Sequence, residues 1–253
     1  MLEGGYTIHQ NLDTLEAPLV SVVTVCQNAG QLLRQCINSI ANQEYKGIEH
    51  IVIDGASTDN TIEILREHEA HIAYWRSERD GGIYDAMNKA LQFVRGKWVI
   101  FLGADDQLLT DFSNILPYLK EENTLYYSNV LYDTVPVGRK INGFFLAKNN
   151  ICHQSILYPK TVFEKYRFKE KYILYADHYL NMQCWSDCRF NFEYCDLLTA
   201  RFATDGASSR RKDLRFMQDK SMLIKEHFGN WSYCWYLFKE FKTKSIARIV
   251  PHY

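Results

Sequence analysis

Long apolar runs are absent from this 253-residue sequence. No stretch approaches the roughly 18 consecutive apolar residues that a membrane-spanning helix needs. The first eighteen residues also lack the apolar segment of a secretory signal peptide. We therefore expect a cytoplasmic protein, and peripheral contact with the inner membrane surface stays open.

An excess of charge is also absent. The sequence holds 29 Lys and Arg residues against 30 Asp and Glu residues, which gives a formal net charge of −1. Because a general nucleic-acid-binding protein shows a basic excess, nucleic acid is not an expected partner. Basic residues do gather between Arg201 and Lys225. This local charge fits phosphates or an anionic membrane surface, and it fits a solvated helix face equally well.

The two common glycine-rich phosphate motifs are missing as well. No G-x-G-x-x-G follows the first predicted strand, and no G-x-x-x-x-G-K-[ST] occurs anywhere. We therefore do not expect a pyrophosphate to be held by the backbone of a glycine-rich loop. The seven cysteines include no two pairs at zinc-site spacing, so a structural zinc is not expected. Cys26 and Cys36 are expected to be small core residues.

The most informative stretch that is present runs from Trp98 to Asp106. Residues 98–102 are an unbroken apolar run, which predicts a central strand buried on both faces. Asp105 and Asp106 follow at the carboxyl end, where open α/β folds bind their ligands. Because adjacent carboxylates repel, the pair indicates a hard divalent cation with oxygen ligands. The alternative is a solvated loop whose acids open a helix.

Strands and helices alternate in the first half. Strands are predicted at residues 20–25, 49–53, 72–76 and 98–102. Three helices are predicted between them, because apolar residues recur at helical spacing from Leu33, after a predicted N-cap at Asp59 or Asn60, and from Ile83. Gly96 is the expected C-cap of the third helix. This alternation predicts an α/β fold with a doubly wound, mostly parallel sheet.

The second half has a mixed pattern. Residues 125–131 predict a strand, residues 135–138 a turn, and residues 190–194 a half-exposed strand. The pattern becomes helical from Asp213 and ends in an aromatic cluster that starts at Trp231. That cluster fits a core, and the lysines among its aromatic residues also fit a membrane interface. Without a Gly/Ser- or Pro-rich linker, we predict one domain with two functional halves.

The loops after the first-half strands are polar or acidic. They span residues 26–30, 54–60 and 103–107, and Asp80 follows the third strand. A nucleobase and its ribose present N–H and O–H donors, so carboxylates at strand ends suit a nucleoside. A cation at Asp105 and Asp106 could then hold the diphosphate.

Taken in order, these motifs resemble those of the family 2 glycosyltransferases of the GT-A fold. The resemblance covers about residues 18–210 and is specific as a set. It is carried by residues 20–25 with Asn28, Asp54-Gly-Ala-Ser-Thr-Asp59, Asp80-Gly-Gly-Ile-Tyr-Asp-Ala-Met-Asn88, Phe101-Leu-Gly-Ala-Asp-Asp106, His153-Gln-Ser155, Tyr175-Ala-Asp-His-Tyr-Leu180 and Gly206-Ala-Ser-Ser209. It implies a nucleotide-diphosphate sugar as donor, Mg²⁺ or Mn²⁺ as cofactor, and in many members the building of bacterial surface polysaccharides on lipid carriers.

The resemblance also implies roles for the donor-side residues. Asp54 would bind the base and Asp80 would lie by the nucleoside, with Asn28 nearby. Asp105 and Asp106 would match the D-x-D element that meets ribose and metal. The first position of that element is Gly103 here, so which acid ligates the metal stays open. Judged without the family, Asp54 and Asp80 could each be turn residues.

On the acceptor side, the resemblance implies that Asp177 is the catalytic base. The family often has Glu before that Asp, and this chain has Ala176. Judged alone, Asp177 would be a solvated residue of a tyrosine-rich helix. His153 would contact the diphosphate, although a core hydrogen bond explains it equally well.

The resulting prediction is an inverting, metal-dependent glycosyltransferase with a UDP-linked sugar favoured as donor and a glycan or lipid-linked hydroxyl as acceptor. Residues 1–18 would be a polar lead-in and 19–210 the GT-A domain, with a donor half at 19–110 and an acceptor half at 111–210. Residues 211–253 would form a helical, basic and aromatic segment. A sugar nucleotidyltransferase and an inactive nucleotide-sugar-binding module are the alternatives.

Overall fold

The computed structural model describes residues 1–8, 10, 17–203 and 212–249, with side chains up to residue 238. The last motif at residues 206–209 lies outside the described residues, and so do Arg210 and Arg211. The same holds for the side chains of Lys239 and of the lysines that follow it.

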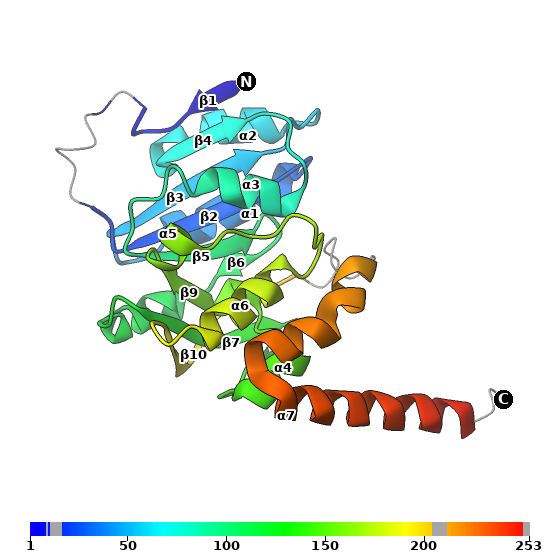
Figure 1. Ribbon diagram of the computed structural model, residues 1–253. Helices are drawn as coiled ribbons and strands as arrows, with labels where there is room; N and C mark the ends of the chain where they lie inside the picture. Colours follow the sequence, from blue (N-terminus) through cyan, green and yellow to red (C-terminus); the bar gives the residue numbers. More distant parts are fainter. Residues whose placement is uncertain (9, 11–16, 204–211, 250–253) are drawn as a thin grey trace.

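The described residues form one mixed sheet with helices on both faces (Figure 1). The strands are β1 (Leu2–Gly4), β2 (Val20–Cys26), β3 (Ile48–Asp54), β4 (Tyr74–Ser77), β5 (Trp98–Gly103), β6 (Gln107–Leu108), β7 (Thr124–Tyr132), β8 (Val135–Val137), β9 (Ile156–Pro159) and β10 (Asn191–Phe202). The helices are α1 (Gly30–Ala41), α2 (Thr61–Glu67), α3 (Ile83–Ala90), α4 (Gly143–Lys148), α5 (Val162–Lys165), α6 (Ala176–Ser186) and α7 (Leu214–Ile249). Short 3₁₀ turns are η2 (Glu69–His71), η3 (Thr110–Tyr118) and η4 (His153–Ser155).

The sheet has the strand order β1-β4-β3-β2-β5-β9-β7-β10-β6, with β8 paired to β7. Strands β4, β3, β2 and β5 are mutually parallel. The chain moves outward from β2 through β3 to β4 and then returns to place β5 on the other side of β2. This reversal is a topological switch point, where open α/β sheets bind ligands at the carboxyl ends of their strands. The predicted doubly wound, mostly parallel sheet is confirmed.

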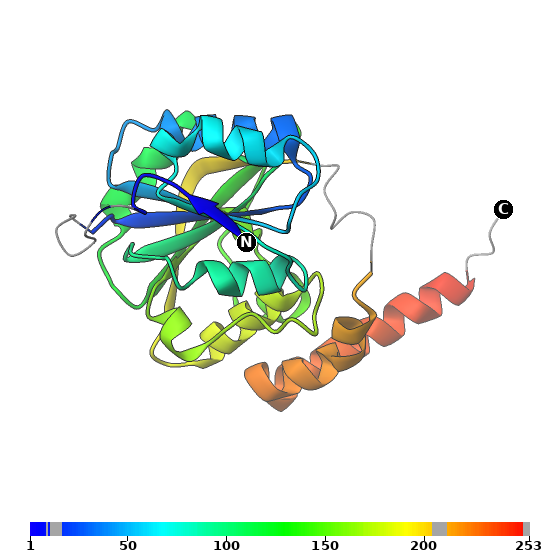
Figure 2. The same ribbon diagram turned by 90° about the horizontal axis from the view of Figure 1, so that it is seen from above.

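Strand β5 lies in the middle of the molecule because both of its faces are apolar. Val99 and Phe101 pack into the cluster beneath α3 and α6, whereas Trp98 and Ile100 pack on the opposite face against α1 and η3. Seen from above, α1 and α2 lie on one side of the sheet and α3 on the other (Figure 2). The prediction of a strand buried on both faces is therefore correct.

Two local predictions were wrong. Gly96 does not cap a helix, because α3 ends at Ala90; its N–H instead donates to Ser21 Oγ at 2.8 Å. Residues 135–137 form β8, not a turn, and the chain reverses at Asp133, whose φ is 55°. Pro136 misled the prediction, since proline is tolerated on an edge strand.

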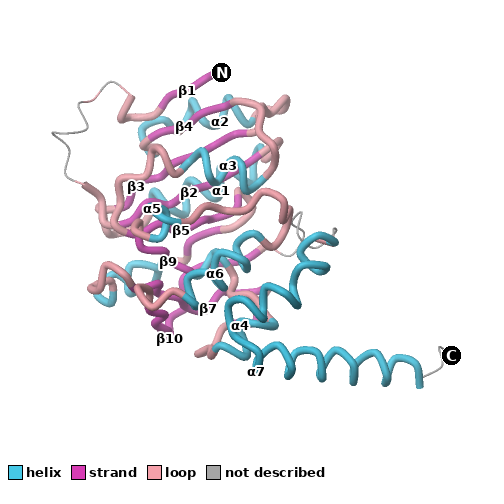
Figure 3. Tube along the Cα trace, viewed as in Figure 1, coloured by secondary structure: helices cyan, strands magenta, loops and turns pink. Residues whose placement is uncertain are grey.

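Other boundaries shift by a few residues. The strand predicted at 72–76 begins at Tyr74, and the one predicted at 190–194 continues to Phe202. Of the two predicted N-caps of α2, Asn60 holds the position but makes no side-chain capping bond, and Asp59 beside it accepts from Thr61 N at 3.0 Å. The acids at 105–106 do not open a helix, because Gln107 starts the short strand β6 (Figure 3).

Helix α7 bends sharply at Gly229, whose φ of 77° lies in the left-handed region. Before the bend it packs on α4 and α6. The first turns after the bend still contact α4, where Trp235 packs on Phe144, and the helix then extends away from the body (Figure 1). The aromatic residues there are divided: Tyr233 packs against the core, whereas Trp231 is 77% exposed. Within the described residues, no helix combines the length and the apolar character needed to cross a membrane.

Candidate active site

Four acidic or polar loops meet at the carboxyl edge of the parallel strands. They follow β2, β3, β4 and β5, and together they carry Asn28, Asp54, Asp80 and Asp105. Because β2 and β5 flank the switch point, their loops border the crevice where a ligand would bind.

Asp54 is fully buried and makes several hydrogen bonds. Its carboxylate accepts from Ser57 N at 2.9 Å, from the Ser57 hydroxyl, and from Ser77 Oγ at 2.6 Å. The Cys26 thiol also donates to it, at 3.6 Å. These bonds join the ends of β2, β3 and β4, so Asp54 sets the shape of the loop that follows β3.

Asn28 joins the first two loops. Its side-chain oxygen accepts from Thr58 N at 2.8 Å, and its own N–H donates to Ser57 Oγ at 2.7 Å. Its φ of 52° is one that Asn adopts more readily than most residues. Asp80 lies beside the same loop: burial raises its pKa, Gly82 N–H and Lys89 lower it, and the charge of Asp54 contributes to the net rise.

The adjacent acids Asp105 and Asp106 have different surroundings. Asp106 is 2% exposed and accepts from Gly103 N at 3.0 Å, Gln154 Nε2 at 2.7 Å and Ala203 N at 2.9 Å. Asp105 accepts no hydrogen bond from another described residue. Burial raises the pKa of Asp105, and the Asp106 carboxylate raises it further. Asp106 therefore connects β5, η4 and the end of β10 through hydrogen bonds, whereas the oxygens of Asp105 are available to a ligand.

Gly103 explains how both acids fit at the end of β5. A Cβ at this position would lie 2.6 Å from Asp106 Oδ2 and 2.8 Å from Asp105 Oδ1. Both distances are shorter than atoms tolerate, so any side chain at residue 103 would displace the two carboxylates. The residue that departs from the D-x-D pattern is therefore the one that lets the acids fold back over the strand.

Asp177 lies in the first turn of α6, at the centre of a buried polar network. It is 5% exposed. Its carboxylate accepts from Tyr84 Oη at 2.9 Å, from Asn150 Nδ2 at 2.8 Å and from His178 N at 2.8 Å. His153 Nδ1 lies 3.4 Å from Asp177 Oδ2. A solvated Asp177 is thus ruled out.

His153 links the network of Asp177 to the pair of acids after β5. Although burial lowers it, the pKa of His153 is raised by the hydrogen bond and charge of Asp177 and by the charges of Asp106 and Asp105. Conversely, burial favours a higher pKa for Asp177, but His153 and Tyr84 hold that pKa below its ordinary value. The pair therefore favours a protonated imidazole beside an ionised carboxylate.

The structure thus brings Asp105, Asp106, His153 and Asp177 into one electrostatic cluster, and it places Asn28, Asp54 and Asp80 together on neighbouring loops. Sequence reasoning missed the partners that hold this cluster: Tyr84, Asn150 and Gln154. Tyr84 and Gln154 stand inside motifs that had been singled out, so their position was a usable signal. Asn150 lies in no such motif.

The fit of a divalent cation rests on Asp105. No group of three His, Cys, Asp or Glu side chains in the described part of the chain is arranged as a metal site. The oxygens of Asp106 are taken by N–H donors, whereas those of Asp105 are available. Mg²⁺ is commonly held by one or two carboxylates together with substrate phosphates. The residues present fit a cation that is shared with a bound diphosphate.

Comparison with known proteins identifies a family and a fold. The model of the family "Glycosyl transferase family 2" matches residues 21–193. PGL/p-HBAD biosynthesis glycosyltransferases of Mycobacterium bovis and Mycobacterium tuberculosis are 29% identical over 208 residues, which is 77% of this chain and 80% of theirs. TuaG of Bacillus subtilis, a glycosyltransferase assigned to teichuronic acid biosynthesis, is 32% identical over 135 residues, covering 49% of this chain and 53% of TuaG.

Solved structures show the same fold. S. aureus TarS 1–349 in complex with UDP-GlcNAc superposes with a TM-score of 0.65 at 14% identity, covering 82% of this chain and 67% of that one. The mannosyltransferase PcManGT from Pyrobaculum calidifontis, in complex with GDP-Man and Mn²⁺, gives a TM-score of 0.63 at 17% identity, covering 84% of this chain and 64% of that one. At these identities the likeness concerns the fold alone.

Proposed function

This chain belongs to glycosyl transferase family 2 and is therefore a glycosyltransferase; we propose that it moves a sugar from a UDP-linked donor to a hydroxyl group of a glycan or lipid-linked acceptor, with inversion, in cell-surface glycan biosynthesis. The observation that carries this proposal is the position of His153. Its Nδ1 atom lies 3.4 Å from Asp177 Oδ2, and the charges of Asp106 and Asp105 also raise its pKa. A donor bound at the β5 loop would therefore lie next to the proposed base.

The donor nucleoside would occupy the crevice bordered by Asn28, Asp54 and Asp80. The carboxylate of Asp80 can accept from ribose or base, while Asp54 would act through the loop that it shapes. A uridine nucleotide is favoured because TarS, which shares the fold, is solved with UDP-GlcNAc. PcManGT is solved with GDP-Man, so a guanosine nucleotide is the competing outcome.

The diphosphate would be met by Asp105 through Mg²⁺ or Mn²⁺ and by His153 directly. When bound, the cation neutralises the charge of the leaving diphosphate. His153 supports this placement because its Nε2 atom has no partner among the described residues, whereas its Nδ1 atom faces Asp177. A raised pKa makes the ring a better donor to phosphate oxygens.

Asp177 would take the proton of the acceptor hydroxyl as that oxygen attacks the anomeric carbon. The new C–O bond forms on the face opposite the leaving UDP, whose bond to the sugar breaks, so the anomeric configuration inverts. The acceptor would approach Asp177 Oδ2, because its contact with His153 is the longest of the four at 3.4 Å. The short bonds from Tyr84 and Asn150 would hold the carboxylate in place.

We also propose peripheral contact of α7 with the cytoplasmic face of a membrane. Leu214, Met217 and Met222 are exposed on its first half, and the basic residues Arg215 and Lys225 are exposed beside them. Apolar side chains flanked by Lys and Arg suit an anionic lipid surface. Co-sedimentation with anionic and with neutral vesicles tests this: binding to neither would remove the proposal.

Titration calorimetry of UDP and of GDP, each with and without Mn²⁺, tests the donor site. Metal-dependent UDP binding that Asp105→Ala weakens is the expected result. Metal-dependent GDP binding would keep the site and change the donor. If neither nucleotide binds, the site drawn around Asp54, Asp80 and Asp105 is wrong. Donor binding without hydrolysis or transfer to any acceptor would favour the inactive nucleotide-sugar-binding module.

A further inference from the structure

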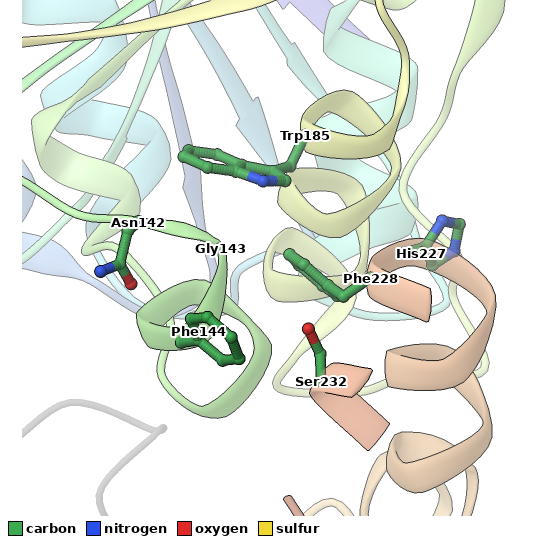
Figure 4. Close-up of a pocket in the computed structure, with 7 residues that line it drawn as sticks. All are labelled: Asn142, Gly143, Phe144, Trp185, His227, Phe228 and Ser232. Carbon is green, nitrogen blue, oxygen red and sulfur yellow. The ribbon is translucent and has the colours of Figure 1, made fainter. Parts of the chain in front are cut away.

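A second cavity lies away from the carboxylates, between α4, α6 and α7. It has a volume of about 540 Å³ and is bordered by Asn142, Gly143, Phe144, Trp185, His227, Phe228 and Ser232 (Figure 4). This volume is within the roughly 300–1,000 Å³ of typical small-molecule sites. Nothing in the proposed reaction uses these residues.

Aromatic rings form much of the cavity wall. Trp185 comes from the end of α6, Phe228 from α7 and Phe144 from α4, and Figure 4 shows the Trp185 indole and the Phe228 ring on opposing sides of the opening. Phe192 packs against Trp185 with ring centroids 5.0 Å apart, and Trp235 packs against Phe144 with centroids 5.6 Å apart. The rings are therefore held in place by neighbours.

Four polar groups of the cavity have no hydrogen-bond partner among the described residues. They are the buried His227 Nε2 atom, the Trp185 indole N–H, the Ser232 hydroxyl and the Asn142 side-chain NH₂, whose oxygen is already occupied as the N-cap of α4. Ser232 is only 8% exposed, and Figure 4 shows its oxygen directed toward Phe228. Because buried polar groups are normally paired, the nearly buried Ser232 hydroxyl and the buried His227 Nε2 atom are available to a ligand.

The cavity carries no formal charge at neutral pH. None of its residues is Asp, Glu, Lys or Arg, and burial lowers the pKa of His227, which keeps that ring neutral. A phosphate or a cation would find no counter-charge here. A pyranose ring does match: its C–H face packs on aromatic rings, whose faces are electron-rich, and its hydroxyls pair with N–H and O–H groups.

The cavity lies on the same helix pair as the proposed catalytic base. Helices α4 and α6 run antiparallel: Leu146 O accepts from His178 Nε2 at 2.6 Å near one pair of ends, and Gly143 meets Trp185 near the other. Asp177 and Trp185 are eight residues apart on α6, a rise of about 12 Å. The proposed base and the cavity thus stand at opposite ends of the same rigid helix pair.

We propose that this cavity binds a neutral sugar unit of the acceptor, remote from the hydroxyl that reacts. That this sugar belongs to the acceptor rests on the proposed function, whereas the binding of a neutral sugar in the cavity does not. The remote contact would let longer acceptors use extra binding energy, so that they are better substrates than a single sugar.

The test uses the full chain labelled with 5-fluorotryptophan and followed by ¹⁹F NMR. The chain has five tryptophans, and Trp185→Phe identifies the Trp185 signal by its loss. Glucose, galactose, mannose, rhamnose and N-acetylglucosamine are titrated with and without UDP and Mn²⁺. We expect at least one of them to shift the Trp185 signal in a saturable way, with UDP leaving the response unchanged.

Ser232→Phe should fill the cavity and lower the affinity for the responding sugar by a factor of at least about ten. Ser221→Phe, the same change on the same helix outside the cavity, is the matched control and should leave the response intact. If Ser232→Phe does not fold, Gly143→Ala serves instead, because its Cβ would lie 3.2 Å from Trp185 Nε1.

Several results would overturn the inference: no response to any of the five sugars, a response that UDP displaces, or one that survives Ser232→Phe. A Trp185 signal that changes only with protein concentration would instead indicate coverage by a second copy. The calorimetry of UDP separates the two proposals. Sugar binding without nucleotide binding would keep the cavity and remove the transferase mechanism, and the reverse result would do the opposite.

Discussion

The donor edge and the start of α6 both bury a carboxylate, but different kinds of neighbour stabilise each one. Asp54 draws its donors from the adjoining loops and strand ends, and the farthest lies 28 positions along the chain. Asp177 is held by Tyr84, 93 positions away, and by Asn150, 27 positions away. The donor edge is therefore assembled locally, whereas the proposed base exists only once the whole domain has folded.

The largest effect on activity is expected for Asp177→Asn. The amide keeps the shape and removes the base, so kcat should fall about 10²- to 10⁴-fold while the donor KM changes little. Sugar transfer from UDP-sugars is the measurement. Asp187→Asn, at the other end of α6, is the control and should retain kcat. Near-normal turnover in Asp177→Asn would place the base elsewhere.

Substitution of the two adjacent acids after β5 should affect different properties, stability for Asp106 and donor binding for Asp105. Asp106→Ala removes three hydrogen bonds to a buried carboxylate and should lower the free energy of unfolding by about 2–4 kcal/mol. Asp105→Ala should leave that free energy within about 0.5 kcal/mol, because it breaks no bond to another residue, yet should weaken metal-dependent UDP binding. Urea unfolding and calorimetry of both variants decide this, and equal losses of stability would contradict it.

A smaller effect is expected at the local network of Asp54. Ser77→Ala removes one of its buried hydrogen bonds and should lower the free energy of unfolding by about 1 kcal/mol, since Ser57 still donates to the carboxylate. Ser113→Ala, whose hydroxyl bond is 3.5 Å long, is the control for urea unfolding. A loss as large as that of Asp106→Ala would mean that the donor edge is not assembled locally.

The smallest expected effect is on the pH dependence of kcat/KM. His153 holds the pKa of Asp177 below its ordinary value, so Asp177 stays ionised until the pH falls through that lowered pKa. Removing the imidazole in His153→Gln should raise the pKa of Asp177 and move the acid limb of kcat/KM toward higher pH. His71→Gln, on the exposed η2 turn, should leave the limb unchanged. An unmoved limb in His153→Gln would show that the two groups are not coupled during catalysis.

The sequence predicted the donor half well because its signals are local. The expected strands at 20–25 and 98–102 each differ from β2 and β5 by one residue, since apolar runs mark buried parallel strands directly. The clustering of Asp54 and Asp80 also followed, because the carboxyl ends of parallel strands share one edge.

The acceptor half could not be predicted to the same depth. The sequence predicts a turn at residues 135–138 because Pro136 and Gly138 dominate the local pattern, whereas pairing with β7 makes residues 135–137 a strand. The burial of Asp177 depends on Tyr84 and Asn150, and a local sequence pattern cannot predict contacts between residues so far apart in the chain. The cavity beside Trp185 is likewise built from three helices that are distant in sequence.

Gly103 has a consequence for protein engineering. Because the first acid of D-x-D is missing, Gly103→Asp looks like a repair of the motif. The space for that side chain is already filled by Asp105 and Asp106, so the repaired motif would force apart the two carboxylates it was meant to assist. A lower melting temperature and weaker nucleotide binding in Gly103→Asp would be the signature. The consensus residue is here the damaging one, and the exception to the motif is what makes the remaining acids usable.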